Sequence, residues 1–170
     1  MRHYGVCGVA GEWTDRQASV FVTGISIICD EANLQPSCSE LTLGTAAFGM
    51  AYGISNPDVP VTASEVEAIL DAAWDAGIRS VDTAPAYGCA EDILGNWMQA
   101  RRRRLYVISK LPSLEGRSGD EVVRLIEQSR TVLKIDRVDG YLAHRMADLQ
   151  EPGVAQTMQS LRENGRIGAF

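Results

Sequence analysis

The feature that most constrains the fold of this chain is a regular alternation of strand-like and helix-like segments that begins at Leu41. Short apolar segments alternate with longer ones in which apolar residues recur at helical spacing. The strand-like segments are 41–45, 78–81, 105–110 and 138–143, with the start of another at 167–170. The helix-like segments are 62–77, 90–99, 120–133 and 153–164. This order predicts an α/β fold in which right-handed βαβ units build a parallel sheet.

Two of these segments carry clear local signals. Thr62 and Glu65 have the spacing of a capping box, in which each side chain satisfies a backbone N–H of the other residue. The segment 105–110 is nearly all apolar, as a strand buried on both faces requires, and it ends on Lys110. The first signal predicts where a helix begins, and the second predicts a strand in the interior of the sheet.

Two architectures fit the alternation. A doubly wound sheet of about this size would be complete in itself. A (β/α)8 TIM barrel needs about 250 residues, and residues 41–170 would supply about four β/α units plus the start of a fifth strand. No Gly-x-Gly-x-x-Gly follows the segment 41–45, which weakens the interpretation as a dinucleotide-binding Rossmann fold.

Residues 1–40 are predicted to form an N-terminal extension of unclear structure. Two β-like runs occur at 4–10 and 19–28, and the polar segment 33–39 is typical of a loop. No residue pattern in this part of the chain indicates chemistry. It could be a plain extension, a strand pair that caps the domain, or a consequence of the chosen start codon.

The charge of the chain limits the classes of binding partner that are expected. A net charge of −6 argues against nucleic acid as the main partner. The exception is the run of four arginines at 101–104, which is interpreted as a solvated loop before a strand, with a local phosphate contact as the alternative.

The cysteines and the apolar segments limit the cellular compartments in which the protein is expected. The four cysteines lie far apart, with no Cys-x-x-Cys and no paired histidine spacing, which argues against a zinc site or a disulfide framework. No apolar run reaches the ~18–20 residues that a membrane span needs. A reducing, cytoplasmic location without a membrane or metal partner is therefore predicted.

Chemically active side chains occur at or just beyond three successive predicted strand ends. Asp82 and Tyr87 follow the second strand, Lys110 ends the third, and His144 follows the fourth. Each has an ordinary structural explanation by itself: a turn-capping acid, a packed ring, a solvated end-of-strand charge and a core histidine. In a barrel, however, the C-terminal ends of the strands converge on one face. An acid, a phenol, an amine and an imidazole would then share one site.

A set of short elements in a fixed order surrounds these residues. The most specific is Asp-Thr-Ala-x-x-Tyr-Gly at 82–88. The others are Leu43-Gly44-Thr45, Phe48-Gly49, Glu91 with Leu94-Gly95, Ile108-Ser109-Lys110, Leu142-Ala143-His144 and Gly165-Arg166-Ile167-Gly168. In order and approximate spacing, residues 41–170 resemble the N-terminal half of an aldo-keto reductase. The resemblance implies a truncated aldo-keto reductase domain over 41–170, with a partial TIM barrel as its fold.

The resemblance also implies an activity, the NAD(P)H-dependent reduction of an aldehyde or ketone to an alcohol. Tyr87 would be the proton donor, although tyrosine with its ordinary pKa of about 10 gives up a proton reluctantly at neutral pH. Lys110 would stabilise the phenolate, and Asp82 would hold Lys110 in place. His144 would hydrogen-bond the substrate carbonyl or share in the proton relay.

The cofactor implied by the resemblance is NADPH, with NADH as the alternative. Gly44, Thr45 and Asp82 would lie near its nicotinamide end, whereas the second half of the family's barrel supplies most of the cofactor site. Three interpretations follow: a reductase recorded as a partial chain or active through assembly, a non-catalytic fragment, and a half-barrel binding or assembly module. The open barrel edges favour homo-oligomer formation.

Overall fold

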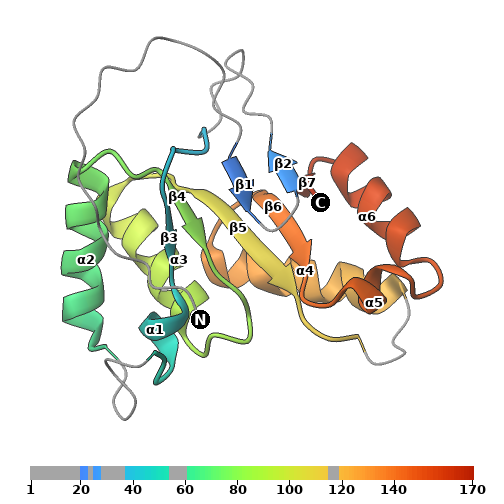
Figure 1. Ribbon diagram of the computed structural model, residues 1–170, viewed down its shortest axis with the longest axis horizontal. Coiled ribbons are helices and arrows are strands. Elements are labelled where there is room, and N and C mark those ends of the chain that lie inside the picture. The colour runs from blue at the N-terminus through green and yellow to red at the C-terminus, as the bar shows by residue number, and fades with distance from the viewer. Residues whose placement is uncertain (1–19, 23–24, 28–36, 54–60, 115–118) are drawn as a thin grey trace.

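The computed structural model describes residues 20–22, 25–27, 37–53, 61–114 and 119–170. Its centre is a five-stranded parallel sheet (Figure 1). The strands are β3 (Thr42–Gly44), β4 (Ser80–Asp82), β5 (Tyr106–Leu111), β6 (Val138–Ala143) and β7 (Ile167–Ala169). They lie in the order β3-β4-β5-β6-β7, the same as their order in the sequence. Doubly wound sheets reverse direction at a switch point, so this unbroken order identifies the fold as part of a (β/α)8 barrel.

Helices follow the strands as the alternation predicts. The long ones are α2 (Ala63–Asp75), α3 (Ala90–Arg101), α4 (Gly119–Leu133) and α6 (Val154–Glu163). Consecutive long helices pack against each other, α2 on α3, α3 on α4 and α4 on α6, and α3 and α4 lie behind the sheet in Figure 1. Two further short helices, α1 (Ala46–Gly49) and α5 (Met146–Leu149), were not predicted because four residues are too few to show helical periodicity.

The hydrophobic core lies between the sheet and this helical layer. Side chains from every layer of the structure reach it, and many are fully buried. They include Leu70, Leu94, Leu111, Leu114, Ile126, Leu133, Tyr141 and Met158. Burying apolar side chains of this size contributes roughly 1.5–3 kcal/mol each, so this interface holds the βα units together.

The capping box at the start of α2 is confirmed. The Thr62 hydroxyl accepts a hydrogen bond from the Glu65 backbone N–H, and the Thr62 N–H donates to Glu65 Oε2 at 2.9 Å. Both hydrogen bonds satisfy N–H groups that the helix itself leaves unpaired. A hydrogen bond from the Thr62 hydroxyl to Glu65 Oε2 at 2.6 Å, together with the one from the Thr62 N–H, lowers the pKa of the Glu65 carboxyl.

The arginine run was predicted as a solvated loop, and this holds only in part: residues 102–104 lie outside helix and strand, but side chains of the run have protein partners. Arg101 is the last residue of α3 and pairs with Asp71 of α2 at 2.8 Å. Arg103 stacks over the Trp74 ring at 5.0 Å, and Arg104 pairs with the buried Asp139 of β6 at 2.7 Å. The run therefore joins α2, α3 and the sheet, because acidic and aromatic partners distant in the sequence surround it.

The N-terminal part contains a separate two-stranded sheet. β1 (Val20–Val22) and β2 (Ile25–Ile27) pair antiparallel, with Val20 opposite Ile27. The predicted β-like run 19–28 thus corresponds to two short strands rather than one, while the run predicted at 4–10 lies outside the described residues. Among the helices that the structure describes, none combines the length and the apolar character needed to span a membrane.

Candidate active site

The register of the sheet aligns one residue from each strand near the C-terminal end. Gly44 pairs with Asp82, Asp82 with Ile108, Ile108 with Gly140, and Gly140 with Ala169. Residues in one such row share a face of the sheet, and so does a residue two positions further along a strand. Lys110, two residues beyond Ile108, therefore lies on the same face as Asp82. Strand pairing alone brings these two groups together.

Asp82 and Lys110 form an ion pair. The Lys110 ammonium contacts Asp82 Oδ1 and also donates to the Thr83 carbonyl oxygen at 3.2 Å. The side chain of Lys110 is 16% exposed and that of Asp82 is 25% exposed. Partial burial strengthens this charge pair relative to one in bulk water. The ammonium is thereby held at one defined position beside the strand ends.

Tyr87 lies next to this ammonium. Lys110 Nζ is 5.1 Å from the centroid of the Tyr87 ring, and the half-buried ring packs against the core. The loop that carries Tyr87 is hydrogen-bonded on both sides: Tyr87 N–H donates to Ala84 O at 3.0 Å, and Ala90 N–H donates to Tyr87 O at 3.2 Å. An acid, an amine and a phenol from β4, β5 and the β4–α3 loop thus meet at one place.

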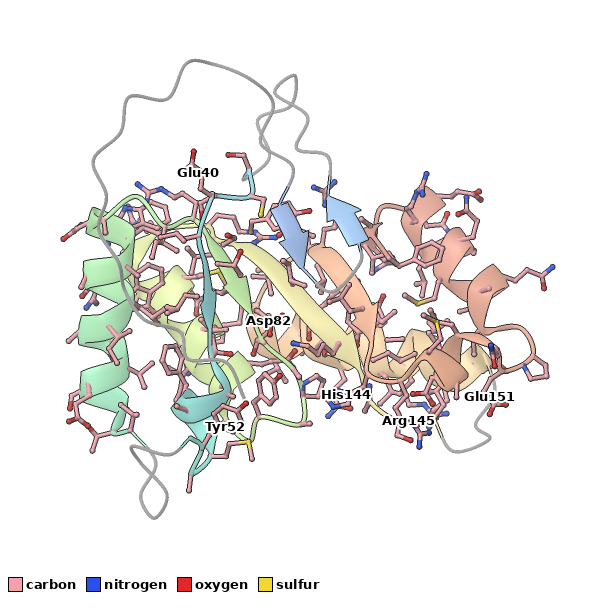
Figure 2. The ribbon with its side chains drawn as sticks, viewed as in Figure 1. Glu40, Tyr52, Asp82, His144, Arg145 and Glu151 are labelled. Carbon is pink, nitrogen blue, oxygen red and sulfur yellow. The ribbon has the colours of Figure 1, made fainter. Side chains whose placement is uncertain are left out.

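His144 lies at the same end of the sheet but does not join this group. It follows β6, where Figure 2 labels it, and its backbone N–H donates to Leu111 O at 3.2 Å. Its side chain is exposed, and no hydrogen bond joins its ring to any described residue. The interpretation of His144 as a core histidine is therefore wrong, since the strand ends before the ring can enter the core.

Gly44 and Thr45 lie on the other side of Asp82. Gly44 is exposed, and a Cβ atom added to it would meet no atom within 4 Å, so there is open space beside Asp82. Thr45 is fully buried, and both its hydroxyl and its N–H donate to the Asp82 carbonyl oxygen at 3.0 Å. Thr45 thus fixes the backbone of Asp82, while Gly44 keeps the approach to Asp82 clear.

The family of this chain is identified by comparison with known protein families. Residues 40–170 match the model of the aldo/keto reductase family. The chain belongs to this family. Within the described residues, no group of three or more His, Cys, Asp or Glu side chains is arranged to hold a metal ion.

The curated relatives of this chain are named as oxidoreductases. A 6-dehydroglucose reductase of Novosphingobium aromaticivorans is 31% identical over 148 residues, which cover 78% of this chain and 48% of that protein. A pyridoxal 4-dehydrogenase of Microbacterium luteolum is 37% identical over 76 residues, which cover 44% of this chain and 20% of that protein. A D-threo-aldose 1-dehydrogenase of a Pseudomonas species is 37% identical over 81 residues, 46% of this chain and 25% of that protein.

Solved structures agree with this assignment. An aldo-keto reductase structure from Pseudomonas aeruginosa superposes with a TM-score of 0.67 at 31% identity, over 78% of this chain and 54% of that one. An aldo-keto reductase of Klebsiella pneumoniae in complex with NADPH superposes with a TM-score of 0.59 at 28% identity, over 77% of this chain and 44% of that one. The chain thus spans about half, or less, of the length of these relatives.

One contact near the site was missed by sequence reasoning, although both of its residues belong to the quoted motif elements. The Ser109 hydroxyl donates to Glu91 Oε1 at 2.6 Å, and both side chains are buried. Burial raises the pKa of the Glu91 carboxyl, and the hydrogen bond from Ser109 opposes that rise. The available signal was strand alternation, which turns Ser109 away from the face that carries Lys110.

Proposed function

We propose that this chain carries the proton-donating part of a carbonyl reductase site, in which an aldehyde or ketone is reduced to an alcohol and Tyr87 supplies the proton. The observation that carries the proposal is the position of the Lys110 ammonium, which is paired with Asp82 and 5.1 Å from the Tyr87 ring centroid. A phenol beside a held ammonium has the chemistry of a general acid at neutral pH.

The proton step follows from these three side chains. As the carbonyl oxygen gains negative charge, the Tyr87 O–H bond breaks and its proton moves to that oxygen. The phenolate that remains is stabilised by the adjacent ammonium of Lys110. Asp82 keeps that ammonium in place, because a lysine side chain left without its partner would sample many rotamers. Asp82 and Lys110 therefore act through their effect on Tyr87.

His144 is proposed to hydrogen-bond the substrate carbonyl. It lies at the C-terminal end of β6, and its ring is exposed and has no hydrogen-bond partner among the described residues. An imidazole in this state is available to an incoming carbonyl oxygen. Substrate contact would give the His144 ring a hydrogen-bond partner, which it lacks among the described residues.

The residues present fit the nicotinamide end of a dinucleotide cofactor. The open space at Gly44 borders Asp82, and the phenol and ammonium lie on the same side of the sheet. When bound, a reduced nicotinamide supplies the hydride that the carbonyl carbon accepts. Gly44, Thr45 and Asp82 would border it. NADPH is the proposed form, since a relative from Klebsiella pneumoniae was solved in complex with NADPH.

The test combines cofactor binding with turnover. NADPH fluorescence is titrated against the chain, and NADPH oxidation is followed with a small aldehyde. Tyr87→Phe removes only the hydroxyl, so cofactor binding should persist while turnover is lost. Tyr106→Phe, at the opposite end of β5, is the matched control and should retain turnover. Full turnover by Tyr87→Phe would contradict the role of Tyr87.

A second candidate function is a non-catalytic binding or assembly module. The observation that favours it is the parallel sheet, in which β3 and β7 have one neighbour each among the described strands and so offer edges to a partner. The same titration separates the two candidates. Saturable NADPH binding supports the reductase, and no binding at millimolar NADPH supports the module.

The sheet edges suggest self-association. Among the described strands of the five-stranded sheet, β3 and β7 have one neighbour each. Unpaired strand edges recruit further strands. We propose that a second copy of the chain pairs with one of these edges. Sedimentation should then show a dimer or larger species, and a folded, monodisperse monomer would contradict this.

A further inference from the structure

We infer that Glu91 and Ser109 form a buried brace that sets the position of Tyr87 relative to Lys110. The brace is defined by the hydrogen bond from the Ser109 hydroxyl to Glu91 Oε1 at 2.6 Å. Its geometry is independent of any ligand, while its consequence for catalysis rests on the proposed function. Glu91 and Ser109 would be positioning residues, since neither lies on the face that carries Lys110.

The first half of the argument concerns β5. Ser109 directly precedes Lys110, and successive residues of a strand point to opposite faces. Lys110 reaches the Asp82 carboxylate on one face, whereas Ser109 is fully buried against the helices on the other. Any shift of Ser109 along or around β5 therefore moves Lys110 as well.

The second half concerns the start of α3. Glu91 is the second residue of that helix and lies four positions after Tyr87. The backbone between them is held by the hydrogen bond from Ala90 N–H to Tyr87 O at 3.2 Å. Because Glu91 bonds to Ser109, the first turn of α3 and the strand that carries Lys110 are joined directly. The short path Tyr87–Glu91–Ser109–Lys110 fixes the distance between the phenol and the ammonium.

The surroundings of the brace show why an acid here has a positional role. Glu91 is 5% exposed, and burial raises the pKa of its carboxyl. The hydroxyls of Ser129 and Tyr141 are buried nearby, and the Ser129 hydroxyl, like that of Ser109, opposes the rise in the pKa of Glu91. A buried acid costs stability relative to an apolar side chain of similar size. What it adds is a directional contact, and that contact goes to the residue beside Lys110.

The experiment measures the Tyr87–Lys110 geometry itself. Nuclear Overhauser effects between the Lys110 side-chain protons and the Tyr87 ring protons are recorded in protein labelled at lysine and tyrosine. Glu91→Ala and Ser109→Ala each remove the brace, whereas Glu91→Gln keeps an oxygen acceptor for Ser109. A displacement of about 1 Å between the Lys110 and Tyr87 side chains would weaken this nuclear Overhauser effect roughly threefold. A displacement of that size costs about a hundredfold in rate. We expect the weaker effect in both alanine variants and near wild-type intensity in Glu91→Gln.

Ser113→Ala is the matched control, because Ser113 also has a buried hydroxyl but takes no part in the brace. It should leave the Tyr87–Lys110 effect unchanged. Unchanged intensity in a folded Ser109→Ala protein would overturn the proposal. A Ser109→Ala chain that fails to fold would also overturn the proposal, because the Ser109 hydroxyl would then serve stability rather than the position of Tyr87.

The outcome separates the brace from the proposed function, because the measurement needs neither cofactor nor substrate. If the wild-type chain turns over carbonyl compounds, Glu91→Ala should lower kcat per folded molecule while the Kd for NADPH stays the same. If the wild-type chain shows no turnover but the alanine variants lose the Tyr87–Lys110 effect, the brace stands and the proposed function fails.

Discussion

The backbones of Gly49 and Gly88 cross so closely that neither position has room for a side chain. A Cβ atom on Gly49 would overlap the Tyr87 carbonyl oxygen, and one on Gly88 would overlap the carbonyl oxygen of Gly49. Gly88 also has a left-handed φ of +60°. The end of α1 and the loop after β4 are thus locked together next to Tyr87, although Gly49 and Gly88 are 39 positions apart in sequence.

Gly88→Ala should destabilise the fold. The left-handed backbone costs about 1–2 kcal/mol for a residue with a Cβ, and the overlap with Gly49 costs about 1–3 kcal/mol more. Urea denaturation measures the loss in free energy of unfolding. Gly44→Ala is the control: its Cβ meets no atom within 4 Å, and its expected change is within about 0.5 kcal/mol. Equal stability of the two variants would contradict the crossing.

Lys110→Met should lower turnover with little effect on cofactor affinity. The substitution removes the ammonium beside Tyr87 and leaves Asp82 without its ion-pair partner. General acid catalysis contributes about a hundredfold to ten-thousandfold, which sets the expected fall in kcat. NADPH oxidation gives kcat, and fluorescence titration gives the Kd. Lys134→Met, which removes an exposed lysine that donates to the side-chain amide oxygens of Asn96 and Gln99 in α3, should retain wild-type kcat.

Asp148 should make stability dependent on acid pH. Its buried carboxylate accepts a hydrogen bond from Arg145 at 3.0 Å and one from the Leu114 N–H at 3.1 Å, and the Arg145 contact holds the pKa of Asp148 below its ordinary 3.8. A folded-state pKa below the unfolded one means that the unfolded chain binds the proton more readily in acid. The stabilisation is therefore present above the ordinary pKa and is lost as pH falls through the folded pKa.

Asp148→Asn should accordingly be less stable than wild type at pH 7, with a gap that narrows toward pH 3. Urea denaturation across this range measures the free energy of unfolding of both proteins. If the difference in free energy of unfolding between the two proteins stays constant with pH, the charge of the Asp148 carboxylate does not contribute to stability.

Asp71→Asn should loosen the packing of α2 on α3. Asp71 accepts hydrogen bonds from Trp97 Nε1 at 3.1 Å and from the Arg101 guanidinium at 2.8 Å, and the Arg101 contact lowers the pKa of Asp71. The denaturation midpoint followed by tryptophan fluorescence should fall, less so in high salt because these groups are partly exposed. Asp75→Asn is the control, since Asp75 is 75% exposed and 4.0 Å from its arginine.

Much of the fold could be predicted because its signals are local. The helical spacing after Thr62 and the apolar run at 105–110 are patterns among residues that are close in sequence. The structure has α2 and β5 at these positions. The motif at 82–88 likewise identified Asp82 and Tyr87 before any contact was known. The protein contacts of the arginine run were missed because its partners, such as Asp71 and Asp139, are about 30 positions or more away.

The sequence by itself determined the order of strands and helices, the capping of α2 and the residue types available at the strand ends. Only the tertiary structure decided that the strands follow one another without reversal, that Lys110 meets Asp82 and Tyr87 while His144 stays exposed, and that Glu91 reaches Ser109. The physical reason is the separation in sequence between the residues that interact. Secondary structure follows from interactions within a few residues, whereas these contacts exist only once parallel strands are paired in register and the helices close over them.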